Sequence, residues 1–323
     1  MDILFISASF FGYAHEITKR LESNGRSVLW FEDRPSIDAK TKALLRLAPS
    51  LIRNKCDSYF NNIISEARQF DIRDVLVIKG EALNPEMIRK MRQALPHARF
   101  ILYFWDSYRN MPADTHQKVS LFDKTLSFDP VDVIKDYRLA YRPLFYLNEY
   151  EKLPDVNLDI DVLFIGTSHT DRYAVLSKLA KRLPQHLRFE KILYMPSAKI
   201  YHARKFVSPS YWHARREEFV FSPLTKLEVM SLIARARVVI DIERPVQFGF
   251  TMRTIEMLGA SRKLLTTNPR IVEADFYNPI NQAFIDRNNP EVSTAFFSKP
   301  WEAMSSSILR KYSLDGWLDD VLG

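Results

Sequence analysis

The side chains best suited to chemistry gather in two short segments of the second half of the sequence. The first segment, "IGTSHTDR", follows an apolar run and carries Gly166, Thr167, Ser168, His169 and Arg172. Backbone N–H groups at a helix start, hydroxyls and a guanidinium are the groups that bind a diphosphate. The same residues also suit a plain helix N-cap followed by a solvated arginine. The segment is therefore either an anion site or a simple cap.

The second segment, "QFGFTMRTIEMLGASRKLLTTN", spans residues 247–268 between two apolar runs. Its first turns carry Gln247, Thr251, Arg253 and Glu256. On a helix Arg253 and Glu256 lie on one face, where they form an intrahelical ion pair or contact a ligand. Apolar residues further along predict a helix packed on a sheet, which leaves its polar start facing a crevice. A carboxylate can accept ribose or sugar hydroxyls while an arginine neutralises phosphate, so the segment predicts a site for a nucleotide-diphosphate sugar.

Four residues of the first half are candidates for a general base that removes a proton from a hydroxyl. His15, Glu16, Glu81 and Asp106 each follow an expected strand. Glu16 could instead pair with Arg20 across one helical turn, and Asp106 could cap the following segment. A base is needed in a transfer that inverts configuration, and none is required in one that retains it.

Short apolar runs alternate with helical segments through the first half of the chain. Several runs are almost continuously apolar, which is typical of parallel strands buried on both faces. Helices are expected between the runs, for example at 15–24 and 85–95. This alternation predicts an open parallel sheet. The expected strands are 3–8, 27–31, 75–78, 100–104 and 125–128.

A polar stretch with a proline, "LNEYEKLPDVNLD", interrupts the alternation and predicts a linker. A second strand–helix series begins with "DIDVLFIG" and continues with expected strands at 189–194, 219–221, 238–242, 263–267 and 283–285. We therefore expect an α/β protein with two Rossmann-like domains that face each other across a cleft, each a parallel sheet flanked by helices. The expected limits are 1–148, a linker at 149–159, 160–305, and a C-terminal segment at 306–323. A last helix at about 301–312 either stays with the second domain or returns to the first.

Composition narrows the classes of protein. The 323 residues suit two domains of about 150 residues each. No apolar run reaches the ~18 residues of a spanning helix, and the N-terminus shows no signal peptide, so we expect a cytoplasmic protein. The single cysteine, Cys56, excludes an internal disulfide framework. No cluster has the spacing of metal ligands, and the sequence lacks both a GxGxxG and a P-loop motif.

The net charge of +7 and the pI of about 9.3 favour polyanionic partners. A basic segment without acids, at 39–56, carries Lys40, Lys42, Arg46 and Arg53 together with apolar residues at helical spacing. Such a segment could lie on an anionic membrane surface, or it could be an ordinary surface helix. Pro49 should interrupt it.

A second basic segment, residues 194–216, interleaves aromatic residues with lysines and arginines. This mixture could hold a nucleotide base or a lipid-linked molecule. The alternative is a partly exposed loop and helix without a ligand. The aromatic residues singled out here are Tyr201, Phe206, Tyr211 and Trp212.

The two chemical segments together resemble the donor-binding half of GT-B glycosyltransferases, and most closely the CgeB-like enzymes of bacterial surface-polysaccharide synthesis. Motifs of the first half are similar to the same group: "FFGYAHEI" after the first expected strand, "YFWDSYRN" after the fourth, and "FDKTLSFDPVD" before "RPLFY". The resemblance covers most of the chain. It implies a nucleotide-sugar donor on the second domain and a glycan or lipid-linked acceptor on the first.

The resemblance also implies roles for single residues. Glu256 matches the carboxylate that such enzymes place on the donor ribose or sugar, and Thr167, His169, Arg172 and Arg253 would stabilise the diphosphate leaving group. The well-known retaining pattern has two glutamates eight residues apart, whereas this sequence has phenylalanine eight positions before Glu256. Stereochemistry is therefore open. A metal-independent hexosyl or related transferase, with the nucleotide sugar as substrate and no resident cofactor, is the expected activity.

Two other functions suit the same elements. A non-enzymatic protein with two lobes could clamp a small ligand, although such proteins are exported and usually cross between lobes more than once. A nucleotide-sugar epimerase would keep the fold and change the chemistry. Nucleic-acid binding is supported by overall charge alone, so we expect no nucleic-acid partner.

Overall fold

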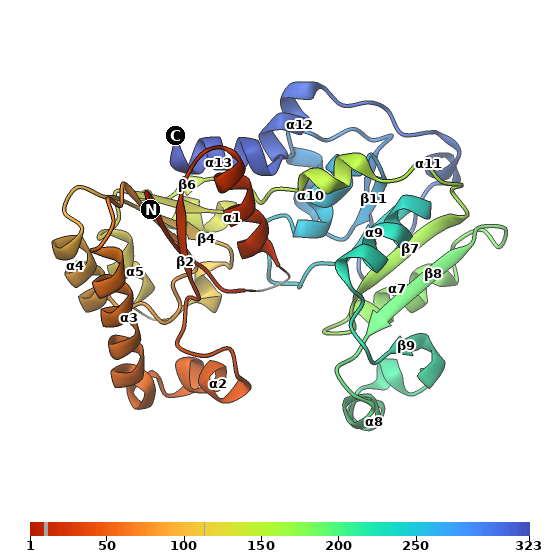
Figure 1. Cartoon of the computed structure of the whole chain (residues 1–323). Coiled ribbons are helices and arrows are strands. Elements are labelled where there is room, and N and C mark those ends of the chain that lie inside the picture. The colour runs from red at the N-terminus through yellow and green to blue at the C-terminus, as the bar shows by residue number, and fades with distance from the viewer. Residues whose placement is uncertain (10–11, 113) are drawn as a thin grey trace. The chain divides into compact units, whose positions relative to one another are not determined.

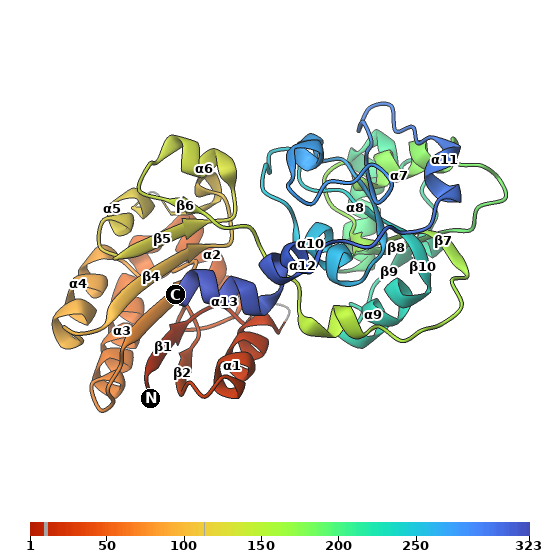
Figure 2. The same ribbon diagram turned by 90° about the horizontal axis from the view of Figure 1, so that it is seen from above.

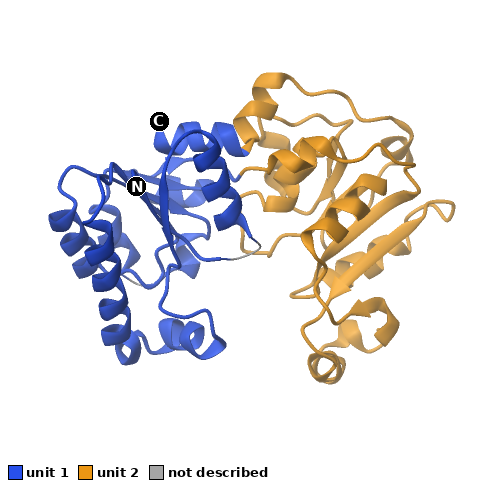
Figure 3. Ribbon diagram, viewed as in Figure 1, with its two compact units in different colours: residues 1–144, 314–323 blue, residues 145–313 orange. Residues whose placement is uncertain are grey.

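The computed structural model describes residues 1–9, 12–112 and 114–323 and divides the chain into two compact units. The first unit contains residues 1–144 and 314–323, and the second contains residues 145–313 (Figure 3). Each unit is an α/β layer structure built on its own sheet (Figure 1). Within the described residues, no helix combines the length and the apolar character needed to cross a bilayer.

The first unit contains a six-stranded sheet ordered β2-β1-β3-β4-β5-β6, in which every neighbouring pair is parallel. The direction in which strands are added reverses between β1 and β3. Such a reversal is a topological switch point, where loops at the carboxyl ends of the strands leave room for a ligand. The strands are β1 (Ile3–Ile6), β2 (Val28–Phe31), β3 (Asp74–Ile78), β4 (Arg99–Phe104), β5 (Lys124–Ser127) and β6 (Ala140–Tyr141).

Helices cover both faces of this sheet (Figures 1 and 2). On one face, α3 and α4 bury apolar side chains such as Phe60 and Met91 against β1, β3 and β4. On the other face, α13 places Trp317 edge-on against Tyr103, with ring centroids 4.9 Å apart. The helices are α1 (Tyr13–Ser23), α2 (Ala39–Leu47), α3 (Arg53–Ala67), α4 (Pro85–Ala94), α5 (Thr115–Val119), α6 (Pro130–Lys135) and α13 (Leu314–Leu322), with 3-10 turns η1 (Pro49–Ile52) and η2 (Tyr108–Asn110).

The second unit has a six-stranded sheet of order β12-β11-β10-β7-β8-β9, again parallel throughout. Counted from β7, this is the 3-2-1-4-5-6 order of the Rossmann fold, and its switch point lies between β7 and β10. The strands are β7 (Ile160–Thr167), β8 (Phe189–Tyr194), β9 (Phe219–Val220), β10 (Ala236–Asp241), β11 (Lys263–Thr266) and β12 (Gln282–Phe284).

The second sheet is also packed on both sides. One core joins β7, β10 and α7 with aromatic residues such as Tyr201 and Tyr211 from the α8 region, and α9 and α10 pack against β7, β10 and β11. The helices are α7 (Arg172–Ala180), α8 (Ala198–Val207), α9 (Lys226–Arg235), α10 (Met252–Gly259), α11 (Thr294–Ser298) and α12 (Ser306–Tyr312), with 3-10 turns η3 (Asn148–Lys152), η4 (Pro209–Tyr211), η5 (Arg216–Glu218) and η6 (Pro269–Glu273).

Every strand with limits given by the apolar runs is present, and its ends lie within two residues of the expected ones. The runs did not indicate β6, because its two residues are exposed and carry no apolar pattern. The expected last helix at about 301–312 is present but begins later, at Ser306, and it is not the last helix. Ser305 caps α12, its hydroxyl accepting a hydrogen bond from the backbone of Ile308, and a separate helix, α13, follows.

The expected linker at 149–159 belongs to the second unit, which begins at Phe145. Aromatic residues fix this stretch. Tyr146 is fully buried, and its hydroxyl donates to the carbonyl of Leu309 at 2.8 Å and lies 2.7 Å from Glu151. Tyr150 in η3 is also buried. The C-terminal segment likewise divides differently from the expected 306–323: residues up to 313 belong to the second unit and the rest, with α13, to the first.

Gly259 lies where α10 packs on the ring of Tyr146. A Cβ at this position would lie 2.5 Å from Cδ2 of that ring, so Gly259→Ala is expected to lower the free energy of unfolding by about 1–3 kcal/mol. Denaturant titration followed by circular dichroism measures the change. Ser261→Gly is the matched control, because Ser261 has a φ of 51° that glycine adopts freely. Equal stability of Gly259→Ala and the natural protein would contradict this packing.

Candidate functional site

The two chemical segments of the second unit meet at its switch point. The first segment follows β7 and the second follows β10, and these strands are neighbours in the sheet, with Val162 paired to Val238 and Phe164 to Ile240. In parallel strands the carboxyl ends lie at the same edge. Turns that are about 80 residues apart in sequence therefore share the place where an open α/β sheet binds its ligand.

The turn after β7 is tightly held. A Cβ on Gly166 would lie 3.1 Å from the Arg172 guanidinium, which explains the small residue there. The Ser168 N–H donates to the carbonyl of Tyr194 at 2.7 Å, and the His169 N–H donates to that of Thr167 at 2.9 Å. These two N–H groups, expected to bind an anion, are thus already used in bonds to protein carbonyls. The hydroxyls and side-chain charges of the turn are therefore better placed to serve a ligand than these two groups.

His169 carries the strongest electrostatic signature of this turn. Burial, followed by the positive charges of Arg172, Arg244 and Arg204, lowers the pKa of His169 to about 4. The imidazole is therefore neutral near pH 7, and its Nδ1 lies 3.2 Å from the Thr170 hydroxyl. Three guanidinium groups acting on one half-buried residue indicate a region of positive potential, which suits an anionic ligand.

Arg172 has a different role from the expected one. Its Nε donates to the carbonyl of Ile242 at 2.7 Å, and its Nη1 donates to that of Thr167 at 3.1 Å. The guanidinium thus joins the carboxyl ends of β7 and β10 across the switch point. Arg172 contributes charge to the site, but at least two of its N–H groups fix the sheet edge.

The start of α10 is organised by Asp241, the last residue of β10. Its Oδ2 accepts hydrogen bonds from the hydroxyls of Thr251 at 2.6 Å and Thr254 at 2.8 Å. Thr251 is also the N-cap, accepting from the N–H of Thr254. Gln247 donates to the carbonyl of Gly249 at 3.1 Å and closes the preceding turn. The helix N-terminus, with its partial positive charge, is therefore fixed at the switch point.

Arg253 and Glu256 form the intrahelical ion pair that their spacing allows, with Nη1 and Oε2 2.9 Å apart. The pair is largely enclosed, since the side chains are 18% and 6% exposed. Tyr150 from η3 packs against both groups, and its pKa is raised by burial and then by the charge of Glu256. The sequence predicts a Glu256 carboxylate that is open to a sugar. In the structure Glu256 instead lies within a buried polar cluster.

Several residues at this edge were missed by sequence reasoning. Arg244 is exposed directly after β10. Arg204 of α8 donates to the Ser168 carbonyl and to the Tyr211 hydroxyl. Glu243 is buried and paired with Arg287, and burial followed by the charge of Asp241 raises its pKa. Glu243 and Arg244 shortly follow an expected strand, and Arg204 lies in the basic segment 194–216, so each had a signal in the sequence, but no local pattern placed Arg204 at the same edge as the other two.

Two base candidates of the first unit are held by ion pairs. Glu81 is buried, with Arg34 and Arg46 each 3.4 Å from its carboxylate. Asp106 lies 2.6 Å from the Lys79 ammonium and is 43% exposed. Asp106 is not a cap, because η2 begins two residues later without a side-chain cap.

The other two candidates lie on the first turn of α1, after β1. His15 is exposed and Glu16 is half-buried. The expected partner of Glu16, Arg20, instead forms a two-pronged ion pair with Asp315 of α13. The motif "FFGYAHEI" lies partly outside the described residues, since these do not include positions 10 and 11. Of the four candidates, His15 is exposed and forms no ion pair with the residues that the structure describes.

The basic segment of the first unit forms α2, η1 and the start of α3, interrupted at Pro49 as expected. Lys40 and Lys42 are exposed. Arg46 is held by the ion pair with the buried glutamate after β3, and Arg53 lies 3.1 Å from the Glu86 carboxylate. Two of the four cations expected to face a membrane, Arg46 and Arg53, therefore have acidic partners.

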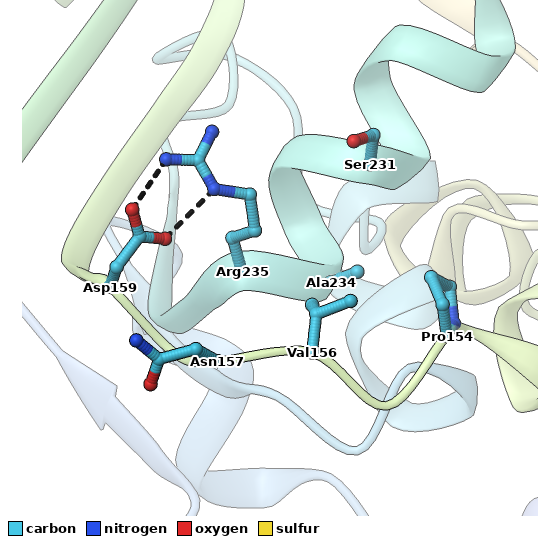
Figure 4. Close-up of a pocket in the computed structure, with 7 residues that line it drawn as sticks. All are labelled: Pro154, Val156, Asn157, Asp159, Ser231, Ala234 and Arg235. Carbon is cyan, nitrogen blue, oxygen red and sulfur yellow. Dashed lines mark hydrogen bonds and ion pairs between the residues drawn. The ribbon is translucent and has the colours of Figure 1, made fainter.

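A surface pocket of about 290 Å³ lies away from the switch point (Figure 4). It is lined by residues before β7 and on α9, with the ion pair of Asp159 and Arg235 at one side. This is the amino-terminal edge of the sheet, about 25 Å of strand from the turn after β7. No group of three His, Cys, Asp or Glu side chains within the described ranges could hold a metal ion.

The architecture of this chain is similar to that of several solved proteins. Neither the models of known protein families nor curated protein sequences match the chain. Three of the solved structures that are similar to this chain cover 100% of it. The apo form of the lipopolysaccharide outer core galactosyltransferase WaaB has a TM-score of 0.58 and 12% sequence identity over 99% of its own chain. Anabaena Alr3699/HepE in complex with UDP and glucose has a TM-score of 0.61 and 11% identity over 99% of its chain, and apo OtsA has a TM-score of 0.63 and 11% identity over 98%. With its two parallel six-stranded sheets flanked by helices, the chain has the fold of the GT-B glycosyltransferases, as its sequence predicts.

Proposed function

We propose that this protein is a glycosyltransferase that transfers a sugar from a nucleotide-sugar donor bound at the switch point of the second unit. The observation that carries the proposal is the meeting of the β7 and β10 turns, with the charges of Arg172, Arg204 and Arg244 acting on a single residue there. A diphosphate needs such a positive site, both in the ground state and as it becomes the leaving group. HepE, with the same fold, is solved in complex with UDP and with UDP-glucose.

The arrangement suggests a distribution of roles. Arg244, exposed after β10, and the N-terminus of α10 would hold the diphosphate, with Thr167 and His169 supplying further hydrogen bonds. Arg253 and Glu256 would act from the buried cluster beside them, where a contact of Glu256 with ribose requires the cluster to open. No metal ion and no resident cofactor is part of the proposal, since the arginines supply the positive charge.

Melting of the protein with different nucleotide sugars tests the donor directly. UDP-, GDP-, TDP-, ADP- and CMP-linked sugars are added in turn, and a donor that binds only the folded state raises the melting temperature. We expect one nucleotide class to stabilise the protein. Absence of a shift with every class would contradict the proposal and favour a two-lobed binding protein for another ligand. Inversion at C4 of the free sugar nucleotide without transfer would favour an epimerase.

Arg244→Ala is expected to weaken donor binding about 10- to 100-fold, because a hydrogen bond to a charged group contributes about 1.5–3 kcal/mol. Isothermal titration calorimetry with the donor found by melting measures the change. Arg237→Ala is the matched control, because Arg237 lies at the amino end of the same strand and pairs with Asp161. Equal losses in both variants would remove Arg244 from the site.

Donor binding is also expected to take up protons through His169. The pKa of its imidazole is about 4 in the free protein, below the ordinary value of about 6.5, so protonation destabilises the free fold as pH falls below 6.5. A bound diphosphate raises this pKa, so affinity should increase as pH falls from 7 towards 4. Calorimetry in buffers of different ionisation enthalpy counts the protons, and a diphosphate sugar does not titrate in this window itself. His169→Asn should abolish the uptake, and uptake that persists in this variant would contradict the assignment.

The acceptor is proposed to be a glycan or a lipid-linked glycan of bacterial surface-polysaccharide synthesis. The support is the resemblance of the motifs to CgeB-like enzymes, together with a basic surface on α2. Lys40 and Lys42 are exposed there, Leu47 of α2 is 85% exposed, and Leu51 of the following turn η1 is 76% exposed. Cosedimentation of Lys40→Glu/Lys42→Glu with phosphatidylglycerol vesicles tests the surface, and binding equal to that of the natural protein would exclude it.

A further inference from the structure

Apolar side chains at α8 and just after it face solvent instead of the core. Phe206 is 89% exposed, Val207 is 80% exposed, and Trp212, after η4, is 57% exposed. Ile200 and Val207 are seven residues apart and lie on one face of the helix. We call Ile200, Phe206, Val207 and Trp212 the α8 patch. Side chains of this size and number on one short segment indicate an interaction surface.

The opposite side of the same segment is firmly packed. Tyr201 is buried, and its hydroxyl donates to the carbonyl of Ala214 at 2.9 Å. Arg204 reaches the Ser168 carbonyl, and its Nη1 lies 2.9 Å from the Tyr211 hydroxyl. The helix therefore has its polar contacts and its buried tyrosines on the inner side. The α8 patch is presented on a fixed support, and inward rotation of its apolar side chains would break these bonds.

The chain around the α8 patch is uniformly basic. From residue 191 to residue 216 there is no aspartate or glutamate. A second copy of the chain would bring the same positive charge to the contact, which opposes a dimer through this surface. An anionic surface would instead attract this positive charge. Lys191 is paired with Glu218 and Arg204 is held on the inner side, so the exposed basic residues of the stretch are Lys199, Lys205, Arg215 and Arg216.

We propose that the α8 patch docks on an anionic lipid membrane, with Phe206, Val207 and Trp212 in the headgroup region and Lys199 and its basic neighbours on lipid phosphates. Aromatic and aliphatic residues beside lysine and arginine are typical of segments that lie in the membrane interface. Ile200 and Val207 have no ring to stack on bases, and Tyr201 and Tyr211 are buried, which leaves Phe206 and Trp212 as the exposed rings of the patch. Lipid therefore suits this surface better than nucleic acid. The surface is separate from α2, and its docking does not depend on the donor site.

Vesicle binding of the full chain tests the proposal. The probe is phosphatidylcholine vesicles with and without phosphatidylglycerol, and binding is measured by cosedimentation. Phe206→Ser/Trp212→Ser should lower the partition coefficient on the anionic vesicles about tenfold or more. Leu227→Ser is the matched control, because Leu227 is a 78% exposed leucine on α9 of the same unit, and it should bind as the natural protein does. Circular dichroism and the melting temperature check that each variant is folded.

Removing a single exposed cation beside the α8 patch should also weaken binding to anionic vesicles. Lys199→Gln is expected to lower the partition coefficient about fivefold, as one cation near an anionic surface does. Lys181→Gln, which removes an exposed lysine after α7, should leave it unchanged. The fivefold effect should shrink as salt is added, because screening weakens attraction to the surface.

A local probe separates the α8 patch from the α2 surface. Val207→Cys and Leu227→Cys are each labelled with a polarity-sensitive fluorophore, since the native Cys56 is buried. Emission at 207 should shift to the blue with phosphatidylglycerol vesicles, and emission at 227 should not. Three results would overturn the proposal: no blue shift at 207, equal sedimentation of Phe206→Ser/Trp212→Ser and the natural protein, or self-association that the double variant removes.

Discussion

Replacing His15 with alanine is expected to lower the rate of sugar transfer about 100- to 10,000-fold, the usual contribution of a general base. His15 is exposed on the first turn of α1, the helix that follows β1, and β1 is one of the two strands at the switch point of the first sheet. Glu81 and Asp106 are instead held by ion pairs with arginines and a lysine. An imidazole without an ion-pair partner can accept the proton of an acceptor hydroxyl, which a carboxylate held by an ion pair does less readily.

The measurement is nucleoside diphosphate release from the donor found by melting, with an isolated glycolipid fraction as acceptor. Lys19→Ala is the matched control, because Lys19 is exposed one turn further along α1, and its rate should be unchanged. Stabilisation of His15→Ala by the donor should equal that of the natural protein, since the proposed donor site lies in the other unit. An unchanged transfer rate in His15→Ala would exclude it as the base and would be expected of a transfer that retains configuration.

Trp317→Ala is expected to lower the free energy of unfolding of the first unit by about 3–5 kcal/mol, the usual cost of removing a buried tryptophan. Its side chain is fully buried on α13 and meets Tyr103 edge-on. Leu314, Leu318 and Val321 of the same helix are also buried. The last ten residues thus complete the core of a unit that otherwise ends at Leu144.

Denaturant titration followed by circular dichroism measures this loss, with the two units treated as separate transitions where the curve requires it. Trp212→Ala is the matched control, because Trp212 is 57% exposed, and its effect should be within about 0.5 kcal/mol. Stabilisation by the nucleotide-sugar donor should persist in Trp317→Ala if only the first unit is weakened. Equal stability of the two tryptophan variants would contradict the role of α13.

Local pattern was enough for most of the secondary structure. Continuous apolar runs such as 100–104 mark strands buried on both faces, and their limits follow because burial begins and ends with the strand. Pattern failed where burial depends on distant residues. β6 has no apolar run, and the stretch around Tyr150 resembles a linker until α10 covers it.

In the candidate site, too, some features follow from the local sequence and others depend on distant residues. The helix starting near Thr251, its cap and the Arg253–Glu256 pair follow from spacing along one helix. The sequence could not show that Asp241 holds this cap, or that Arg172 joins two strand ends. Each of these contacts joins groups separated by a loop or by a whole crossover.

The sequence by itself determined two Rossmann-like α/β domains and the positions of two polar turns at strand ends, because periodicity and turn chemistry are local properties. Only the tertiary structure decided that β7 lies beside β10, which brings Arg204, Arg244 and His169 into one electrostatic environment. It also decided that Glu256 is enclosed and that Phe206 faces solvent. The physical reason is that strand order and burial depend on contacts between residues far apart in the chain, which no local pattern encodes.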